Sequence, residues 1–147
     1  ISYLQDPRHF FMLKDQISQI ILLDLTRGKE LLSIGTNFPT TAGGIYGIYK
    51  IYREMFQTKS DLVEIHFQDN FLFMHTYDVY NGLSIQKIAA VIITKRQTTG
   101  MKGSLRLMLT KFIQRYEKDL VQTDNLDVAL FQPFKQEILQ IFDYAIK

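Results

Sequence analysis

Cysteine is absent from this chain of 147 residues, which excludes disulfides, thiolate zinc sites and thiol nucleophiles. Long apolar runs are absent too: the longest, Ile20 to Leu23 and Ile88 to Ile93, fall far short of the roughly 18 residues that a membrane span requires. Neither sign of charge dominates, because 17 Lys and Arg residues oppose 15 Asp and Glu residues. These absences predict a cytoplasmic protein with no transmembrane segment and no nucleic-acid partner, and they leave peripheral association with membranes open.

The composition is that of an ordinary globular protein, with 46% hydrophobic and 22% charged residues. A chain of this length buries roughly 68% of the surface that it exposes when unfolded, which is enough for one core. We therefore predict a single domain over residues 1–147. Residues 1–16 form an extra N-terminal segment in which both a short helix after Pro7 and an extended strand fit the pattern.

Two β-rich runs, residues 17–25 and 30–38, predict the first pair of strands. The segment Thr26-Arg27-Gly28-Lys29 lies between them, and Gly28 can adopt a positive φ at little cost. A β-hairpin is the simplest structure that fits this pattern.

A helix is predicted over residues 41–57, after Pro39, with Thr40 or Thr41 as its N-cap. The apolar positions of this helix follow three- and four-residue spacing, which predicts one buried face: Ile45, Ile48, Tyr52, Met55 and Phe56. The opposite face carries Lys50, Arg53 and Glu54, as expected for a surface helix.

Residues 61–67 and 71–77 predict a second hairpin, with Gln68-Asp69-Asn70 as a three-residue turn. Pairing about Asp69 places Ile65 opposite Phe73 and Val63 opposite His75. Alternation then puts one set of side chains on a strongly apolar face: Val63, Ile65, Phe67, Phe71, Phe73 and Tyr77. In this register His66 and His75 lie on opposite faces.

A loop over residues 78–84 precedes a strand over residues 85–95, whose continuous apolar run predicts a central position in the sheet. A long amphipathic helix is predicted over residues 101–122, and a last helix begins at Pro133. The buried stripe predicted for the long helix is Leu105, Met108, Leu109, Phe112, Ile113, Tyr116 and Leu120. Its basic face fits either a docking surface for an acidic protein or anionic lipid, or a solvated surface, and the solvated surface is favoured.

No catalytic, cofactor or metal site is predicted. The glycines at 43, 44 and 47 lack the spacing of a dinucleotide fingerprint and the Gly-Lys-Ser/Thr ending of a phosphate loop. The histidines do not share a face in the predicted register. Acid pairs such as Asp119 with Asp124 and Asp61 with Glu64 lie at element ends, where capping and solvation explain them.

The resulting order, β-β-α-β-β-β-α-α, resembles the longin family and is similar to the related roadblock domains. The features that carry the resemblance are the run Ile20 to Leu25 with Arg27-Gly28-Lys29, the helix over 41–57, the strand Lys87 to Thr94 and the two closing helices. The fold class that it implies is α+β: a five-stranded antiparallel sheet with one helix on one face and two on the other.

The resemblance further implies a non-catalytic scaffold for small GTPases or membrane-trafficking machinery, without cofactors, that works as a homodimer or with another longin- or roadblock-like subunit. The contact surface would map onto the helix over 41–57 and the strand over 61–67. Among its residues we expect surface contacts from Tyr46, Tyr49, Lys50 and Arg53, since exposed tyrosine beside arginine is typical of protein interfaces.

Two other classes of function remain as alternatives. The first is a ligand-sensing domain of the PAS or profilin-like kind, in which Phe71, Phe73, His75 and Tyr77 line a cavity instead of filling a core. The second is an enzyme whose site has no recognisable motif.

Overall fold

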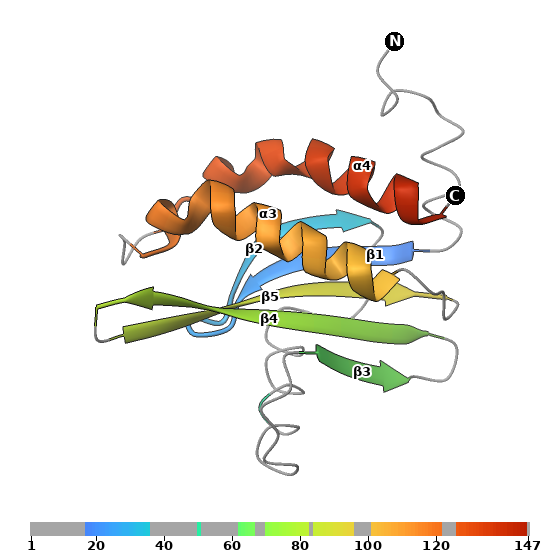
Figure 1. Cartoon of the computed structure of the whole chain (residues 1–147), viewed down its shortest axis with the longest axis horizontal. Coiled ribbons are helices and arrows are strands. Elements are labelled where there is room, and N and C mark those ends of the chain that lie inside the picture. Colours follow the sequence, from blue (N-terminus) through green and yellow to red (C-terminus); the bar gives the residue numbers. More distant parts are fainter. Residues whose placement is uncertain are drawn as a thin grey trace.

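The computed structural model describes residues 17–35, 50, 62–66, 70–82, 84–95, 101–121 and 126–146. The described part begins with five strands: β1 (Ile17–Asp24), β2 (Lys29–Gly35), β3 (Leu62–His66), β4 (Phe71–Asn81) and β5 (Ser84–Thr94). They are followed by helix α3 (Met101–Val121), the 3₁₀ helix η2 (Val128–Phe134) and helix α4 (Lys135–Ile146). Figure 1 gives their arrangement.

The five strands form one antiparallel sheet in the order β2-β1-β5-β4-β3 (Figure 1). The prediction of an α+β fold with a five-stranded antiparallel sheet is therefore confirmed. Strand β5 lies in the middle, as its continuous apolar run predicted, and pairs with β1 on one side and β4 on the other. The sequence-distant strands β1 and β5 thus become neighbours.

Both faces of the central strand are buried. Alternate residues Ile88, Ala90 and Ile92 belong to a cluster that includes the helices. Ala89, Val91 and Ile93, which alternate with them, belong to a second cluster on the other face. The other buried members of this second cluster come from the first hairpin and from β4: Ile21, Leu23, Leu25, Leu72 and Met74. Because side chains of a strand alternate between faces, each strand next to β5 contributes to both clusters.

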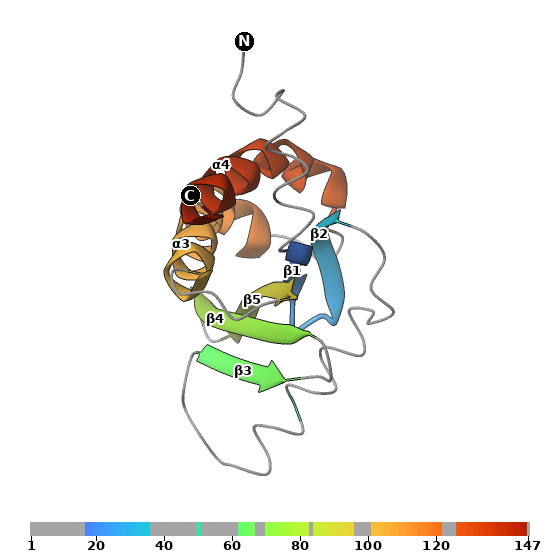
Figure 2. The same ribbon diagram turned by 90° about the vertical axis from the view of Figure 1, so that its right-hand side faces the viewer.

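Helices α3 and α4 lie on the same side of the sheet (Figure 2). All seven residues of the stripe predicted for α3 are buried, and all seven belong to the larger cluster. Phe112 and Tyr116 pack their rings against Phe131 and Phe134 of η2, with centroids 5.0 to 6.1 Å apart. Helix 41–57, expected on the opposite face, lies outside the described residues except for Lys50, which is helical and exposed.

The register predicted for the second hairpin was wrong by one residue. Ile65 pairs with Leu72 and His66 with Phe71, whereas the prediction paired Ile65 with Phe73. A shift of one residue moves every side chain to the other face. Ile65 therefore joins Leu72 and Met74 in the second cluster, while Glu64 shares the helix face with Phe73.

Two element boundaries also differ from the prediction. Residues 78–81 continue β4 instead of forming a loop, and Asn81 pairs with Ser84 across a tight turn in which Gly82 has φ 60°. The last helical segment begins before Pro133: Asp127 caps η2 by accepting a hydrogen bond from the Ala129 amide, and α4 follows at Lys135. Proline lacks an amide hydrogen, and here it lies near the junction between the two helices.

Gly35 at the end of β2 is the glycine whose replacement should cost most. It has φ 114°, and an added Cβ would lie 2.5 Å from the backbone oxygen of Ser18 in the neighbouring strand. We expect Gly35→Ala to lower the free energy of unfolding by about 2 kcal/mol or more, because backbone must move to relieve the contact. Urea denaturation measures this change.

Gly103 supplies the matched control, because it lies in α3 without a positive φ and an added Cβ meets nothing within 4 Å. Gly103→Ala should raise the free energy of unfolding by about 1 kcal/mol through helix propensity. Equal effects of the two substitutions would contradict the backbone contact at Gly35.

Candidate functional site

Of the four side chains predicted to form the interface, the structure describes Lys50, which is helical and exposed. Tyr46, Tyr49 and Arg53 lie outside the described residues. The strand predicted to share the contact surface is β3, at the edge of the described sheet. Strand β3 and Lys50 are therefore the described parts of the predicted contact surface.

Strand β3 is joined to the start of α3 by an ion pair between Glu64 and Lys102, and Glu64 also forms a hydrogen bond with His66 of its own strand. Its Oε2 lies 3.1 Å from Lys102 Nζ, and its Oε1 lies 3.1 Å from His66 Nε2. The hydrogen bond from His66 is the largest influence on Glu64 and, with the charge of Lys102, it lowers the pKa of this carboxyl below its ordinary value. Lys102 also lies 6.0 Å from the centroid of the Phe73 ring. Glu64 thus couples the edge strand to the helix layer.

A second polar cluster lies at the β1–β2 turn, residues 25–28. Asp24 is completely buried, and its Oδ2 accepts a hydrogen bond from the Arg27 guanidinium at 2.8 Å. Its Oδ1 accepts a hydrogen bond from the Arg27 amide at 3.0 Å. Arg27 therefore supplies both a backbone and a side-chain donor to one buried carboxylate. The side chain of Arg27 is 21% exposed, so its charge remains near solvent.

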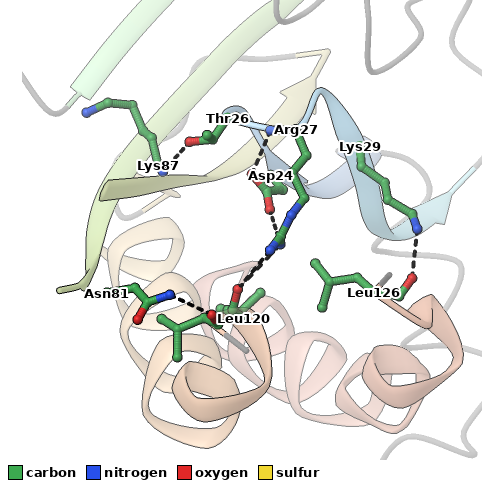
Figure 3. Close-up of polar contacts among 9 residues, drawn as sticks. Asp24, Thr26, Arg27, Lys29, Asn81, Lys87, Leu120 and Leu126 are labelled. Carbon is green, nitrogen blue, oxygen red and sulfur yellow. Dashed lines mark hydrogen bonds and ion pairs between the residues drawn. The ribbon is translucent and has the colours of Figure 1, made fainter. Parts of the chain in front are cut away.

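The same turn contacts the C-terminal end of α3 (Figure 3). Both terminal nitrogens of Arg27 lie 3.4 Å from the carbonyl oxygen of Leu120, while Asn81 Nδ2 donates to the carbonyl of Val121 at 2.7 Å. Lys29, the first residue of β2, contacts the chain beyond this helix, where its Nζ donates to the carbonyl of Leu126 at 2.7 Å. The last carbonyls of a helix have no partner within it, and they carry the negative end of its dipole. We call Asp24, Arg27, Lys29 and Asn81 the helix clamp.

The central strand holds the turn from its other side. Thr26 Oγ1 accepts a hydrogen bond from the Lys87 amide at 2.8 Å (Figure 3). The Leu25 amide donates to the Lys87 carbonyl, also at 2.8 Å. The turn is consequently fixed between β5 and the end of α3. This arrangement positions the end of α3, and its donors already have acceptors within the protein, namely main-chain carbonyls and the carboxylate of Asp24.

The histidine geometry differs from the prediction. Pairing of His66 with Phe71 puts His66 and His75 on the same face, since Phe71 and His75 are four residues apart in β4. They remain separated along the strand by about 13 Å. Within the described residues, no group of three or more His, Asp or Glu side chains has the geometry to hold a metal ion.

The residues proposed to line a cavity in the ligand-sensing alternative differ in solvent exposure. Phe73 is 1% exposed and belongs to the cluster under α3, whereas Tyr77 is 47% exposed. Packing of Phe73 with the helix residues favours its interpretation as part of the core.

Sequence reasoning missed the helix clamp and the ion pairs of Glu64. Asp24 and Arg27 appear in the sequence only as a strand end and a turn, because the carbonyl that Arg27 reaches is 93 residues further along the chain. The one local signal was the pair of cations flanking Gly28, which is more than a tight turn requires. Glu64 was attributed to solvation, and the register error concealed its approach to Lys102.

Comparison with protein-family models gives no match to this chain, and comparison with curated protein sequences gives none either. Among the described residues, no helix combines the length and hydrophobicity needed to cross a bilayer. The described geometry and the sequence pattern are therefore the basis for the function proposed below.

Removal of the Arg27 side chain should strongly destabilise the protein. Arg27→Ala leaves the Asp24 carboxylate buried without its guanidinium partner, and breaking one side of a buried ion pair costs about 3–5 kcal/mol. Denaturant unfolding measures the loss. The double variant Arg27→Ala/Asp24→Asn should recover part of it, since the buried charge is gone; no recovery would contradict a charge-based cause.

The Glu64 pairs predict a pH-dependent contribution to stability. Because the folded state lowers the pKa of Glu64, its contribution is present above the ordinary glutamate pKa of 4.5 and is lost as the pH falls through the lower folded value. We expect the wild type to exceed Glu64→Gln in unfolding free energy near neutral pH, and the two to converge in acid.

Urea denaturation at a series of pH values makes this comparison. In a His66→Gln background the difference should depend less on pH, since the hydrogen bond with the largest influence on Glu64 is altered. A difference that grows as the pH falls would disprove the assignment.

Proposed function

We propose that this protein is a non-catalytic interaction platform of the longin or roadblock kind, which binds small GTPases or components of membrane-trafficking machinery. The observation that carries the proposal is the five-stranded antiparallel sheet followed by two closing helices on one face. Fold supports a class of function by analogy only, so the site must be tested directly.

The proposed contact surface consists of the helix over 41–57 together with the neighbouring sheet edge. Lys50, helical and exposed, supports a surface position for this segment. The described edge strand β3 is short and carries the charged group at Glu64, which protects an edge from unspecific strand pairing. Specific recognition would then depend on side chains, foremost the aromatic and arginine side chains of the helix.

A binding experiment tests this surface. Purified small GTPases of trafficking pathways, each loaded with GDP or a non-hydrolysable GTP analogue, are titrated with wild type and with Tyr46→Ala/Tyr49→Ala/Arg53→Glu. At an interface we expect the variant to lose on the order of 2 kcal/mol or more of binding free energy. Light scattering over a concentration series reports in parallel whether a homodimer forms and whether the variant dissociates it.

The chain offers a matched control for this variant. Tyr77→Ala/Tyr80→Ala/Lys95→Glu makes the same two tyrosine truncations and an equal reversal of charge; Tyr77 is 47% exposed, Tyr80 is 68% exposed, and Lys95 is also exposed. The control should bind and self-associate as the wild type does. Absence of binding to every GTPase in both nucleotide states, together with a monomer in all samples, would contradict the proposal; native mass spectrometry would then test for a bound small molecule.

A further inference from the structure

The outer face of α3 combines exposed cations with one exposed apolar side chain. The inner face of the helix is filled, with Leu105, Met108, Leu109, Phe112 and Leu120 each 0% exposed. On the outer face, Leu107 is 46% exposed and is not part of the hydrophobic core. The core therefore does not explain why a leucine occupies this position.

The basic residues of α3 fall into two groups. Lys102 and Arg115 have acidic partners, Glu64 at 3.1 Å and Glu137 at 3.5 Å. Arg106, Lys111 and Lys118 are exposed and form no ion pair with any residue in the described part of the chain. The structure therefore separates cations that hold elements together from cations that remain available.

Helical spacing aligns the available groups. Positions 107, 111, 114 and 118 follow each other at intervals of four, three and four, so Leu107, Lys111, Gln114 and Lys118 form one stripe opposite the buried side. The stripe is about 16 Å long at 1.5 Å per residue. It contains no acidic residue; Glu117 and Asp119 project from its flanks. We call this set the α3 stripe.

We infer that the α3 stripe docks on the surface of an anionic lipid membrane. Phosphate and carboxylate headgroups complement Lys111 and Lys118, which have no ion-pair partner among the described residues, and the apolar boundary beneath the headgroups accepts Leu107. Lysine suits this position because its long apolar stem can extend along the boundary while its ammonium group stays at the headgroups. The stripe lies along one side of a straight helix, so all of its side chains can reach one flat lipid surface at the same time. The inference is independent of the proposed GTPase platform, because it rests on different residues.

Vesicle co-sedimentation tests the inference, with phosphatidylcholine vesicles that contain or lack phosphatidylserine. Wild type should pellet only with the anionic vesicles and be released by salt. Each cation near such a surface contributes roughly fivefold in affinity, so Lys111→Ala/Lys118→Ala should bind about 25-fold more weakly. Leu107→Gln should weaken binding on the order of fivefold, since it removes the apolar contact without changing charge.

The matched control is Lys95→Ala/Lys135→Ala, which removes the same charge from positions outside α3. It should bind as the wild type does, and circular dichroism should report folded protein in every sample. Equal losses in both lysine pairs, or no wild-type binding to anionic vesicles, would overturn the inference. Binding of a duplex DNA probe as tight as that of vesicles, and insensitive to Leu107→Gln, would assign the stripe to another polyanion.

Discussion

The constraint on which this fold depends is the burial of β5 on both faces. Every side chain from Ile88 to Ile93 is apolar and 0% exposed, and successive side chains of a strand point in opposite directions. A strand of this kind is stable only where both sides are removed from water. Helices α3 and α4 with η2 satisfy one face, and the burial of Leu72 and Met74 is evidence that the other face is shielded as well. Because both faces of β5 are buried, a binding partner can contact only the edges of the sheet, the turns and the outer faces of the helices.

Covering a sheet does not by itself fix the direction of a helix, and the helix clamp supplies that information. Hydrophobic contacts are non-directional, whereas the carbonyls of Leu120 and Val121 accept from donors at defined positions. Burial of the Asp24 carboxylate costs desolvation free energy. Arg27 offsets this cost because it donates hydrogen bonds both to the carboxylate and to the Leu120 carbonyl at the end of α3. The clamp therefore ties the first hairpin to the end of α3.

Features that depend on neighbouring residues were predicted correctly, whereas features that depend on contacts between residues far apart in the sequence were not. The stripe of α3 and the central position of β5 depend on local periodicity, and both were predicted correctly. The register of β3 was not, because β4 offers apolar residues on both faces, Phe73 on one and Met74 on the other. Alternation could not distinguish the two registers; the contact between Glu64 and Lys102 does, and it joins distant segments. The helix clamp was missed for the same reason.

The small net charge of +2 conceals a segregation of charge that bears on function. In the described part of the chain, three cations have structural partners within the protein: Arg27 pairs with Asp24, Lys29 donates to a carbonyl, and Lys87 pairs with Asp78 at 2.7 Å. Lys111 and Lys118 differ, because no acidic side chain projects from the stripe between them. Glutamates three or four residues away on the same helix would stabilise α3 by pairing with these lysines. The arrangement, in which neither lysine has an acidic partner among the described residues and Leu107 is exposed beside them, gives up that stabilisation and fits the anionic membrane surface that we propose as the partner.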